Sequence, residues 1–259
     1  MNAAPRAQLS AVLITRNAAG VLDACLESIA FADEIVVVDN ASTDRTREIA
    51  REFGARVLEV PDWPGFGPQK NRALEACTGD WILALDADER VEEPLRAEIE
   101  HALAHAAFDI YAMPRRSTYC GRYIRHGGWW PDYVTRLFRR GSARYSDARV
   151  HERLVTDRPV GRLRAPLTHY SFRSMDQVVA KMNHYSSEGA RMLADRGRAP
   201  GLASAIGHGV AAFFRTYVVR LGFLDGRYGF LLAVSNAEGS YYRYVKAMLA
   251  AETRRDDIE

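Results

Sequence analysis

Two aspartates that flank a single residue, Asp86 and Asp88, are the clearest chemical feature of this 259-residue sequence. They follow the apolar run Trp81–Leu85, which is typical of a buried β-strand. In the turn after such a strand, two carboxylates can face one divalent cation, and their hard oxygen atoms suit Mg²⁺ or Mn²⁺. The same triplet also occurs in solvated turns, so the preceding strand is what favours metal binding here.

Other polar residues stand where neighbouring strands are expected to end. Thr15, Arg16 and Asn17 follow the first apolar run of the chain, and Asp39 ends the second. An acid in that position can hydrogen-bond a nucleoside, or it can simply shape a turn. Lys70 stands on a predicted short helix, where its ammonium can face a diphosphate or only solvent.

The elements that must position these residues alternate between strand and helix. Strands are predicted at Leu9–Thr15, Glu34–Asp39, Arg56–Val60 and Trp81–Leu85, with helices capped by Asn17 and by Ser42 or Thr43, from Pro68 to Cys77, and at Glu92–Ala107. This rhythm indicates an α/β fold with a Rossmann-like, mostly parallel sheet and flanking helices. In such a sheet ligands gather at the carboxyl ends of the strands, where the polar residues above are expected.

After residue 108 the pattern changes to a β-rich region and then to helices. Strands are predicted at Asp109–Arg115, Val134–Arg139, Arg149–Val155 and Gly161–His169, and helices at Met175–Arg196, Leu202–Leu221 and Tyr228–Ala250. We therefore divide the chain into a tail (1–8), an α/β and β-rich domain (9–170, with halves 9–107 and 108–170), a helical region (171–252) and a second tail (253–259).

Charge is distributed unevenly along the sequence. Residues 1–100 hold 10 basic and 19 acidic side chains, whereas residues 101–259 hold 25 and 14. Thirteen arginines against four acids lie between Arg115 and Arg164, which suggests either a funnel for a phosphorylated substrate or anionic lipid, or solvated strand faces. The acidic first half argues against a nucleic-acid partner. Within the basic segment, Asp132, His151 and Glu152 are candidate bases, although each can instead pair with a neighbouring arginine.

Cysteine content and hydropathy bear on the cellular location. Three cysteines far apart in the sequence form neither a disulfide framework nor a zinc motif, and no signal peptide is evident. No apolar stretch of about 18 residues is apparent, so we expect a cytoplasmic protein whose membrane contact, if any, is peripheral at the inner face of the inner membrane. The apolar, arginine-bearing segments Ala211–Leu221 and Tyr241–Met248 suit either a membrane surface or a protein partner.

Taken together, four short motifs resemble the core of the family 2 glycosyltransferases, which have the GT-A fold. They are ITRN, VVVDNASTDRT, GPQKNRA and DWILALDADE, in the order and spacing of that family. Four further segments, RHGGWWPDYVTRLFRRG, VHERL, LTHYSF and GFLDGRYGF, are similar to one branch of it, the bacterial lipopolysaccharide inner-core β-glucosyltransferases.

The resemblance implies a role for each of the polar residues in the first half. Thr15, Arg16 and Asn17 would line the nucleotide pocket, Asp39 would hold the uracil or ribose, and Lys70 would lie near the nucleotide-sugar. Asp86 and Asp88 would be the metal motif, with Asp88 the direct ligand. The family's acidic base motif aligns with His151–Glu152, but the second acid is missing, so Glu152 is favoured over Asp132.

The implied reaction is an inverting transfer of a hexose from a UDP-sugar to a heptose of the anionic lipopolysaccharide core, and the hexose expected is glucose. The divalent cation would neutralise the leaving diphosphate, and one of the candidate acids would deprotonate the acceptor hydroxyl. Another glycolipid or polysaccharide acceptor is the main alternative. A nucleotidyltransferase is disfavoured because the segment ITRNAAG lacks the Gly- and Arg/Lys-rich loop that usually follows the first strand.

Overall fold

The computed structural model describes residues 7–147 and 153–256. Two compact units can be distinguished. Unit 1 consists of the residues up to Arg115 together with Tyr133–His169, and unit 2 consists of Arg116–Asp132 together with the chain from Tyr170 onward. Segment 116–132 therefore groups with the C-terminal helices.

The sheet is built around a parallel core of four strands. In spatial order these are β3 (Arg56–Glu59), β2 (Glu34–Asp39), β1 (Leu9–Thr15) and β4 (Trp81–Leu85). The order then continues through β8 (Asp132–Arg139), β6 (Ile110–Tyr119), β12 (Leu167–Phe172) and β5 (Glu89–Arg90), with β7 (Arg122–Tyr123) and β11 (Val160–Arg162) pairing with β6. Strand β8 runs antiparallel to β4, so the parallel part ends at the strand that carries the aspartates.

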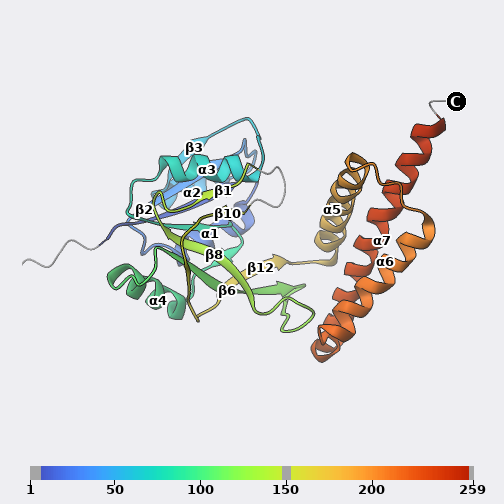
Figure 1. Ribbon diagram of the computed structural model, residues 1–259. Helices are drawn as coiled ribbons and strands as arrows, with labels where there is room; N and C mark the ends of the chain where they lie inside the picture. Colours follow the sequence, from blue (N-terminus) through green and yellow to red (C-terminus); the bar gives the residue numbers. More distant parts are fainter. Residues whose placement is uncertain (1–6, 148–152, 257–259) are drawn as a thin grey trace, which may run out of the picture. The chain divides into compact units, whose positions relative to one another are not determined.

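Helices cover both faces of this parallel core (Figure 1). They are α1 (Ala19–Ser28), α2 (Thr46–Glu52), α3 (Phe66–Ala76) and α4 (Glu93–Ala104). Alternation along β1 explains the two layers, because Ala11 and Leu13 pack with the buried side chains of α1 and α4, whereas Val12 packs with Ala73 of α3. The mostly parallel α/β sheet predicted from the sequence is thus confirmed.

A small antiparallel ribbon, β9 (Arg144–Tyr145) with β10 (Leu154–Val155), accompanies the sheet in unit 1. Asn71 of α3 ties this ribbon down, because its side chain donates to the Tyr145 carbonyl and accepts from the Tyr145 amide, each at 2.9 Å. Of the strand predicted over Arg149–Val155, residues 153–155 are described, and Leu154–Val155 form β10.

Three long helices form most of unit 2, namely α5 (Met175–Asp195), α6 (Leu202–Phe214) and α7 (Gly226–Asp256), and they lie side by side (Figure 1). Between α6 and α7 the chain forms a π-helical turn, η1 (Arg215–Val219), and a 3₁₀ turn, η2 (Gly222–Asp225). The helix expected over Leu202–Leu221 is therefore two elements. Segment 116–132 packs with these helices through a cluster that contains Tyr119, Ile124, Val178 and Leu232.

Two local expectations are corrected by the structure. Asn17 does not cap α1, whose N-cap is Ala18 and which has no side-chain capping bond, and α2 begins after Arg45 rather than after Ser42 or Thr43. The polar side chains are instead used at the strand ends, as described below. The expectation that no apolar stretch of about 18 residues exists is also corrected, because Leu202–Val219 is long and apolar enough to cross a membrane by length and composition alone.

Candidate active site

The strand register brings the predicted nucleotide-side residues and the aspartate motif to one edge of the sheet. Thr15 is paired with Asp39 across β1 and β2, and Leu13 is paired with Leu85 across β1 and β4. The chain segments that follow β1, β2 and β4 therefore leave the sheet together, at the carboxyl ends of parallel strands. This is the edge at which open α/β sheets bind their ligands.

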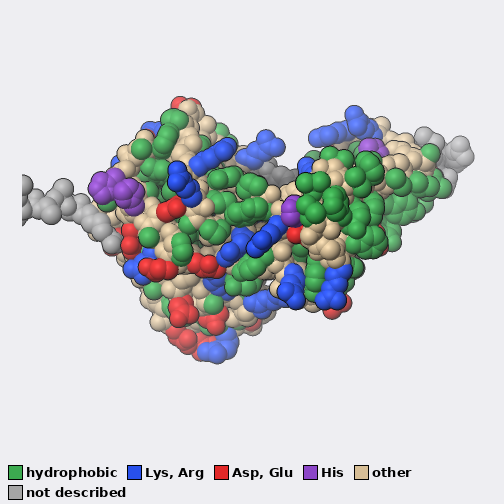
Figure 2. Space-filling model, turned by 90° about the horizontal axis from the view of Figure 1, so that it is seen from below, with side chains coloured by type: hydrophobic (Ala, Val, Ile, Leu, Met, Phe, Trp, Pro, Cys, Tyr) green, Lys and Arg blue, Asp and Glu red, His purple; other side chains and the backbone are tan. Residues whose placement is uncertain are grey.

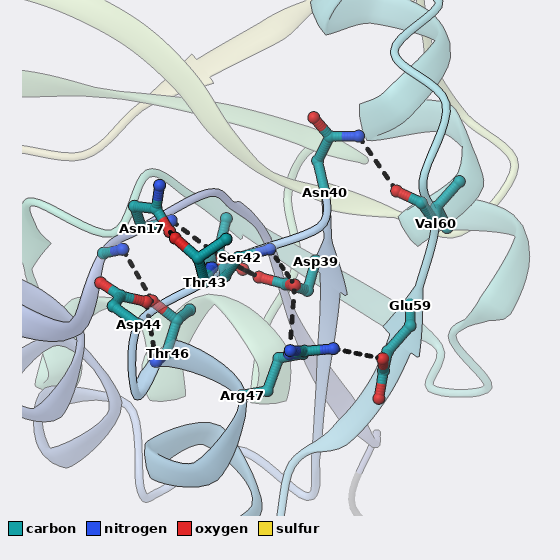
Figure 3. A network of polar contacts seen from close by, with 12 residues as sticks. Asn17, Asp39, Asn40, Ser42, Thr43, Asp44, Thr46, Arg47, Glu59 and Val60 are labelled. Atoms are coloured by element: carbon teal, nitrogen blue, oxygen red, sulfur yellow. Dashed lines mark hydrogen bonds and ion pairs between the residues drawn. The ribbon is translucent and has the colours of Figure 1, made fainter.

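Asp39 is the centre of a buried polar network at this edge (Figure 3). Its carboxylate, which is 0% exposed, accepts hydrogen bonds from the Thr15 hydroxyl at 3.0 Å, the Ser42 amide at 2.9 Å and the Ser42 hydroxyl at 2.5 Å. The Nε atom of Arg47 lies 3.8 Å from the same carboxylate. These contacts satisfy the charge, which a buried carboxylate requires.

The turn after β2 is fixed by side chains rather than by a helix cap. Asn17 and Ala41 both have left-handed backbone conformations, each with φ of 50°. The Asn17 amide donates to the Ser42 hydroxyl, and the Asn17 side-chain oxygen accepts from the Thr43 amide, both at 2.8 Å (Figure 3). Asn40 donates from its side chain to the Val60 carbonyl at 3.0 Å. The strand ends are thereby held as one rigid rim.

Asp86 lies in a cluster of opposite charges immediately after β4. One of its carboxylate oxygens is 3.3 Å from Nζ of Lys70, and the other is 2.5 Å from Nη2 of Arg136. The same guanidinium nitrogen is 2.7 Å from Glu89, whose side chain is 0% exposed and also accepts from the Asp86 amide at 3.0 Å. Glu89 in turn has Nη1 of Arg115 at 3.7 Å.

These charges determine the protonation state of the cluster. Burial opposes ionisation of Asp86, but the positive charges of Arg136 and Lys70 outweigh it and hold the pKa of that carboxyl below its ordinary range. Burial likewise disfavours the charged form of Arg136, yet the two carboxylates raise the pKa of its guanidinium well above the ordinary value. Asp86 is consequently ionised and engaged by cations throughout the neutral pH range.

Asp88 faces a different partner from Asp86. Its Oδ2 atom lies 3.5 Å from Nε2 of His169 on β12, and both side chains are partly exposed. Carboxylate oxygen and imidazole nitrogen are both accepted metal ligands, so this pair fits a divalent cation that takes its remaining ligands from a diphosphate and water. Among residues 7–147 and 153–256, no group of three acids, histidines or cysteines is placed to hold an ion by itself.

The remaining predicted site residues are distributed as follows. Arg16 is exposed and follows Thr15 at the end of β1. Asp132 is half-buried at the start of β8 and belongs to unit 2. Both His151 and Glu152 lie outside the described residues, so the choice between Glu152 and Asp132 as the base stays a prediction.

Three residues that contact Asp86 or Asp88 were not singled out from the sequence. Arg136, Glu89 and His169 come from β8, β5 and β12, which the fold brings to the end of β4. A signal for Arg136 exists in the segment VTRLF, because a charged residue within an apolar strand implies a buried partner. Glu89 and His169 carry no comparable local signal.

The arginine-rich segment is partly neutralised by acids from other parts of unit 1. Ion pairs join Arg139 and Arg158 to Asp109, and Arg144 to Glu75. Arg115 and Arg136 pair with the cluster acids described above. These five arginines are therefore engaged by acids of the protein itself.

A cavity of about 740 Å³ in unit 1 lies away from this edge. It is lined by residues of α3, of the turn after β8 and of the β9–β10 ribbon, and none of the predicted site residues is among them. Size alone thus does not locate the chemistry, whereas the convergence of acids and cations at the strand ends does.

Comparisons with known proteins identify the family of the chain. Residues 10–156 match the family model described as Glycosyl transferase family 2. An uncharacterized glycosyltransferase of Rickettsia bellii is 32% identical over 92% of this chain and 85% of its own length. The lipopolysaccharide core biosynthesis glycosyltransferase LpsC of Rhizobium meliloti is 32% identical over 94% of this chain and 92% of its own length.

Among solved structures, residues 1–349 of S. aureus TarS in complex with UDP-GlcNAc superpose with a TM-score of 0.50 and 14% identity. That match covers 96% of this chain and 92% of the TarS chain. It supports a shared GT-A fold, while the sequence comparisons establish kinship. The chain therefore belongs to the family 2 glycosyltransferases.

Proposed function

We propose that this enzyme transfers glucose from UDP-glucose to a heptose of the lipopolysaccharide core, with inversion at the anomeric carbon to give a β-linkage. The observation that carries the proposal is the cluster of Asp86, Asp88, Lys70 and His169 at the carboxyl end of β4, where acids and cations suited to a metal and a diphosphate converge. The similarity to LpsC over nearly the whole of both chains supports a lipopolysaccharide core acceptor.

The donor is proposed to lie along the rim of strand ends. Thr15, Arg16 and Asn17 would line the nucleotide pocket, and Asp39 would recognise the uracil or ribose from within its network. The structure buries Asp39 and commits both of its oxygens to Thr15 and Ser42. In this proposal the carboxylate therefore acts mainly by fixing the rim against which the nucleoside packs.

Asp88 and His169 are proposed to hold Mg²⁺ or Mn²⁺ together with the donor diphosphate. When bound, the cation would neutralise charge on the leaving group. Lys70 would place its ammonium beside the same diphosphate as a point charge. Asp86, which Arg136 and Lys70 already engage, would orient these two cationic side chains and accept at most a water-mediated contact with the metal.

A carboxylate of the acceptor region is proposed to remove the proton of the attacking hydroxyl. Glu152 remains the first choice, with Asp132 second, and His151 adjacent to Glu152 would assist it. The attack would form the new glycosidic bond as the bond to UDP breaks on the opposite face. UDP and the lengthened core would be the products.

The test is release of UDP by the purified enzyme from UDP-glucose with a core oligosaccharide that ends in heptose. Release is expected only with both the acceptor and Mg²⁺ or Mn²⁺ present. Parallel reactions with UDP-galactose, UDP-GlcNAc and ADP-heptose would identify the donor. Turnover that survives chelation would contradict the metal assignment, and turnover with a different acceptor, such as another glycolipid or a polysaccharide, would replace the heptose assignment.

Unit 2 carries a surface that supports peripheral attachment to the inner face of the inner membrane. Leu202, Ile206, Val210 and Phe214 follow one another at four-residue intervals on α6, and each is more than half exposed. Figure 2 shows hydrophobic side chains gathered over the helical part of the molecule, with basic groups at their border. A stripe of this kind suits an interface between lipid headgroups and acyl chains.

Flotation with vesicles that contain anionic lipid tests this attachment. The wild-type protein is expected to float with the vesicles, whereas a variant with Ile206→Ser and Val210→Ser is expected to remain in the dense fraction. The control Val155→Ser changes an equally exposed apolar residue in unit 1 and should float normally. Absence of binding at low salt would remove the membrane proposal, and self-association through α6 would replace it.

A further inference from the structure

Unit 2 contains a cavity of about 470 Å³ that is separate from the strand-end site of unit 1. Its walls come from α5, from the end of α6 with η1, from α7, and from the segment Gly127–Trp129. The volume lies within the range that is usual for small-molecule sites. All of the lining residues belong to unit 2.

The cavity wall is positively charged. Lys181, Arg215, Arg220 and Arg243 line it, and no acidic residue does. Within the described part of the chain, none of these four side chains forms an ion pair, in contrast to the arginines of unit 1. Four cations that converge from different elements without a counter-charge favour binding of a multiply charged anion.

Aromatic rings also line the cavity. The rings of Tyr119, Trp129 and Phe172 are in mutual contact, with centroids 5.7–6.1 Å apart. The ammonium of Lys181 lies 4.8 Å from the Phe172 ring centroid, so a cation stands beside the aromatic wall. Ser235 and Asn236 also line the cavity, where the Ser235 hydroxyl lies 2.8 Å from the Tyr119 hydroxyl and the Asn236 amide nitrogen donates to the Thr216 hydroxyl at 3.2 Å. An apolar ring face beside polar and cationic groups matches a sugar that carries a phosphate.

The backbone around the cavity is held in unusual conformations. The Gly127 amide donates to the Arg220 carbonyl at 2.8 Å, and Asp225 accepts from the His126 amide at 2.8 Å. Gly128 has φ of 86°, and a side chain there would overlap the Arg220 guanidinium. Arg215 lies on the π-helical turn η1, a feature often found at functional sites. These contacts hold Arg220 close to the cavity segment.

We propose that this cavity binds a phosphorylated sugar, with the phosphate held by Arg215, Arg220, Arg243 and Lys181 and the sugar ring against Trp129 and Phe172. Binding itself is independent of turnover in unit 1. We also assign this phosphorylated sugar to the acceptor of the reaction, and that second assignment rests on the proposed function. The phosphate can be carried by a free sugar or by a lipid-linked saccharide, and the two sources are separated below.

Calorimetric titration of the full chain with glucose 6-phosphate tests the free form, with glucose and inorganic phosphate as comparisons. The lipid-linked form is tested by flotation with phosphatidylcholine vesicles that do or do not contain lipid A, which is a phosphorylated glucosamine disaccharide. Saturable binding is expected in at least one arm. Glucose 6-phosphate is expected to bind more tightly than either comparison, because both halves of the ligand are recognised.

Arg243→Gln and Lys181→Gln should each weaken this binding at least about tenfold, because each removes a charge-assisted contact to phosphate. Arg243→Lys, which keeps the charge, should retain part of the affinity. Arg198→Gln is the matched control, since it makes the same charge change at an exposed position outside the cavity lining. Thermal unfolding should show that all four variants remain folded.

Three results would overturn the proposal. They are the absence of saturable binding in both arms, equal weakening by Arg198→Gln and Arg243→Gln, and binding that Arg243→Gln leaves unchanged in both arms. Sensitivity to Arg243→Gln with glucose 6-phosphate identifies the free form, and sensitivity only with lipid A identifies the lipid-linked form. Failure of this inference is distinguishable from failure of the proposed function. The titration and the flotation contain no donor and test binding alone, whereas UDP release tests the proposed function.

Discussion

Removing the guanidinium of Arg136 should destabilise unit 1 more than removing the guanidinium of any surface arginine. Arg136 is 6% exposed and joins Asp86 at 2.5 Å to Glu89 at 2.7 Å, and Glu89 is fully buried. In Arg136→Met the apolar stem is retained, but two carboxylates lose their principal cation. Loss of one partner from a buried ion pair costs about 3–5 kcal/mol.

Part of that cost is offset in this particular site. The Nε atom of Arg136 is buried and has no hydrogen-bond partner among residues 7–147 and 153–256, and its removal relieves about 1 kcal/mol or more of desolvation. Arg115 also lies 3.7 Å from Glu89 and retains some attraction. We therefore expect Arg136→Met to lower the free energy of unfolding of unit 1 by about 3 kcal/mol.

Urea denaturation measures this change, with hydrogen exchange of peptides from β4 and β8 used to assign it to unit 1 rather than unit 2. Arg45→Met is the matched control, because Arg45 forms salt bridges only at an exposed helix start, and it should not shift the midpoint measurably. In a Glu89→Gln background, Arg136→Met should cost clearly less, since one orphaned charge is absent. A loss below about 1 kcal/mol, or equal losses in both backgrounds, would refute the buried-pair reasoning.

The other predictions concern catalysis and pH. Asp88→Asn should abolish metal-dependent UDP release without changing the unfolding midpoint, and His169→Ala should weaken Mn²⁺ binding at least about tenfold, as measured by calorimetry with UDP present. Glu152→Gln should lower kcat by about 10²–10⁴ with little effect on KM, whereas full activity there together with loss in Asp132→Asn would transfer the role of base. Because Asp86 has a lowered pKa in the folded state, its contribution to stability is present above the ordinary Asp pKa and is lost as the pH falls through the folded pKa. Asp86→Asn should therefore reduce the loss of stability at acidic pH. An unchanged loss would contradict the pairing of Asp86 with Arg136 and Lys70.

The parallel core could be predicted from the sequence because its information is local. Runs such as Glu34–Asp39 are apolar and β-branched, and the boundaries predicted for β1, β2 and β4 agree with the structure. The positions of Thr15, Asp39 and Asp86 at one edge follow from parallel pairing alone. For this reason the sequence alone could predict that these residues share one edge of the sheet.

The partners of the aspartates could not be predicted in the same way. Arg136 is 50 residues from Asp86 and reaches it only because β8 pairs antiparallel with β4. His169 reaches Asp88 because β12 pairs with β5. Local rules also failed for Asn17, whose side chain bonds Thr43 rather than capping α1, since the tertiary contact competes with the cap. Long-range pairing, not composition, decides these contacts.

The chain passes from unit 1 into unit 2, returns to unit 1 and then enters unit 2 again, and this order has a consequence for synthesis. Residues 116–132 belong to unit 2, but residues 133–169 of unit 1 separate them from the helices that complete it. During translation Tyr119 and Ile124 emerge well before Val178 and Leu232, with which they form one apolar cluster. Truncation after residue 169 would leave that cluster without its partners, so the sheet-bearing unit cannot be isolated by a single cut. The nascent chain must therefore keep Tyr119 and Ile124 in solution until α7, which carries Leu232, has been synthesised.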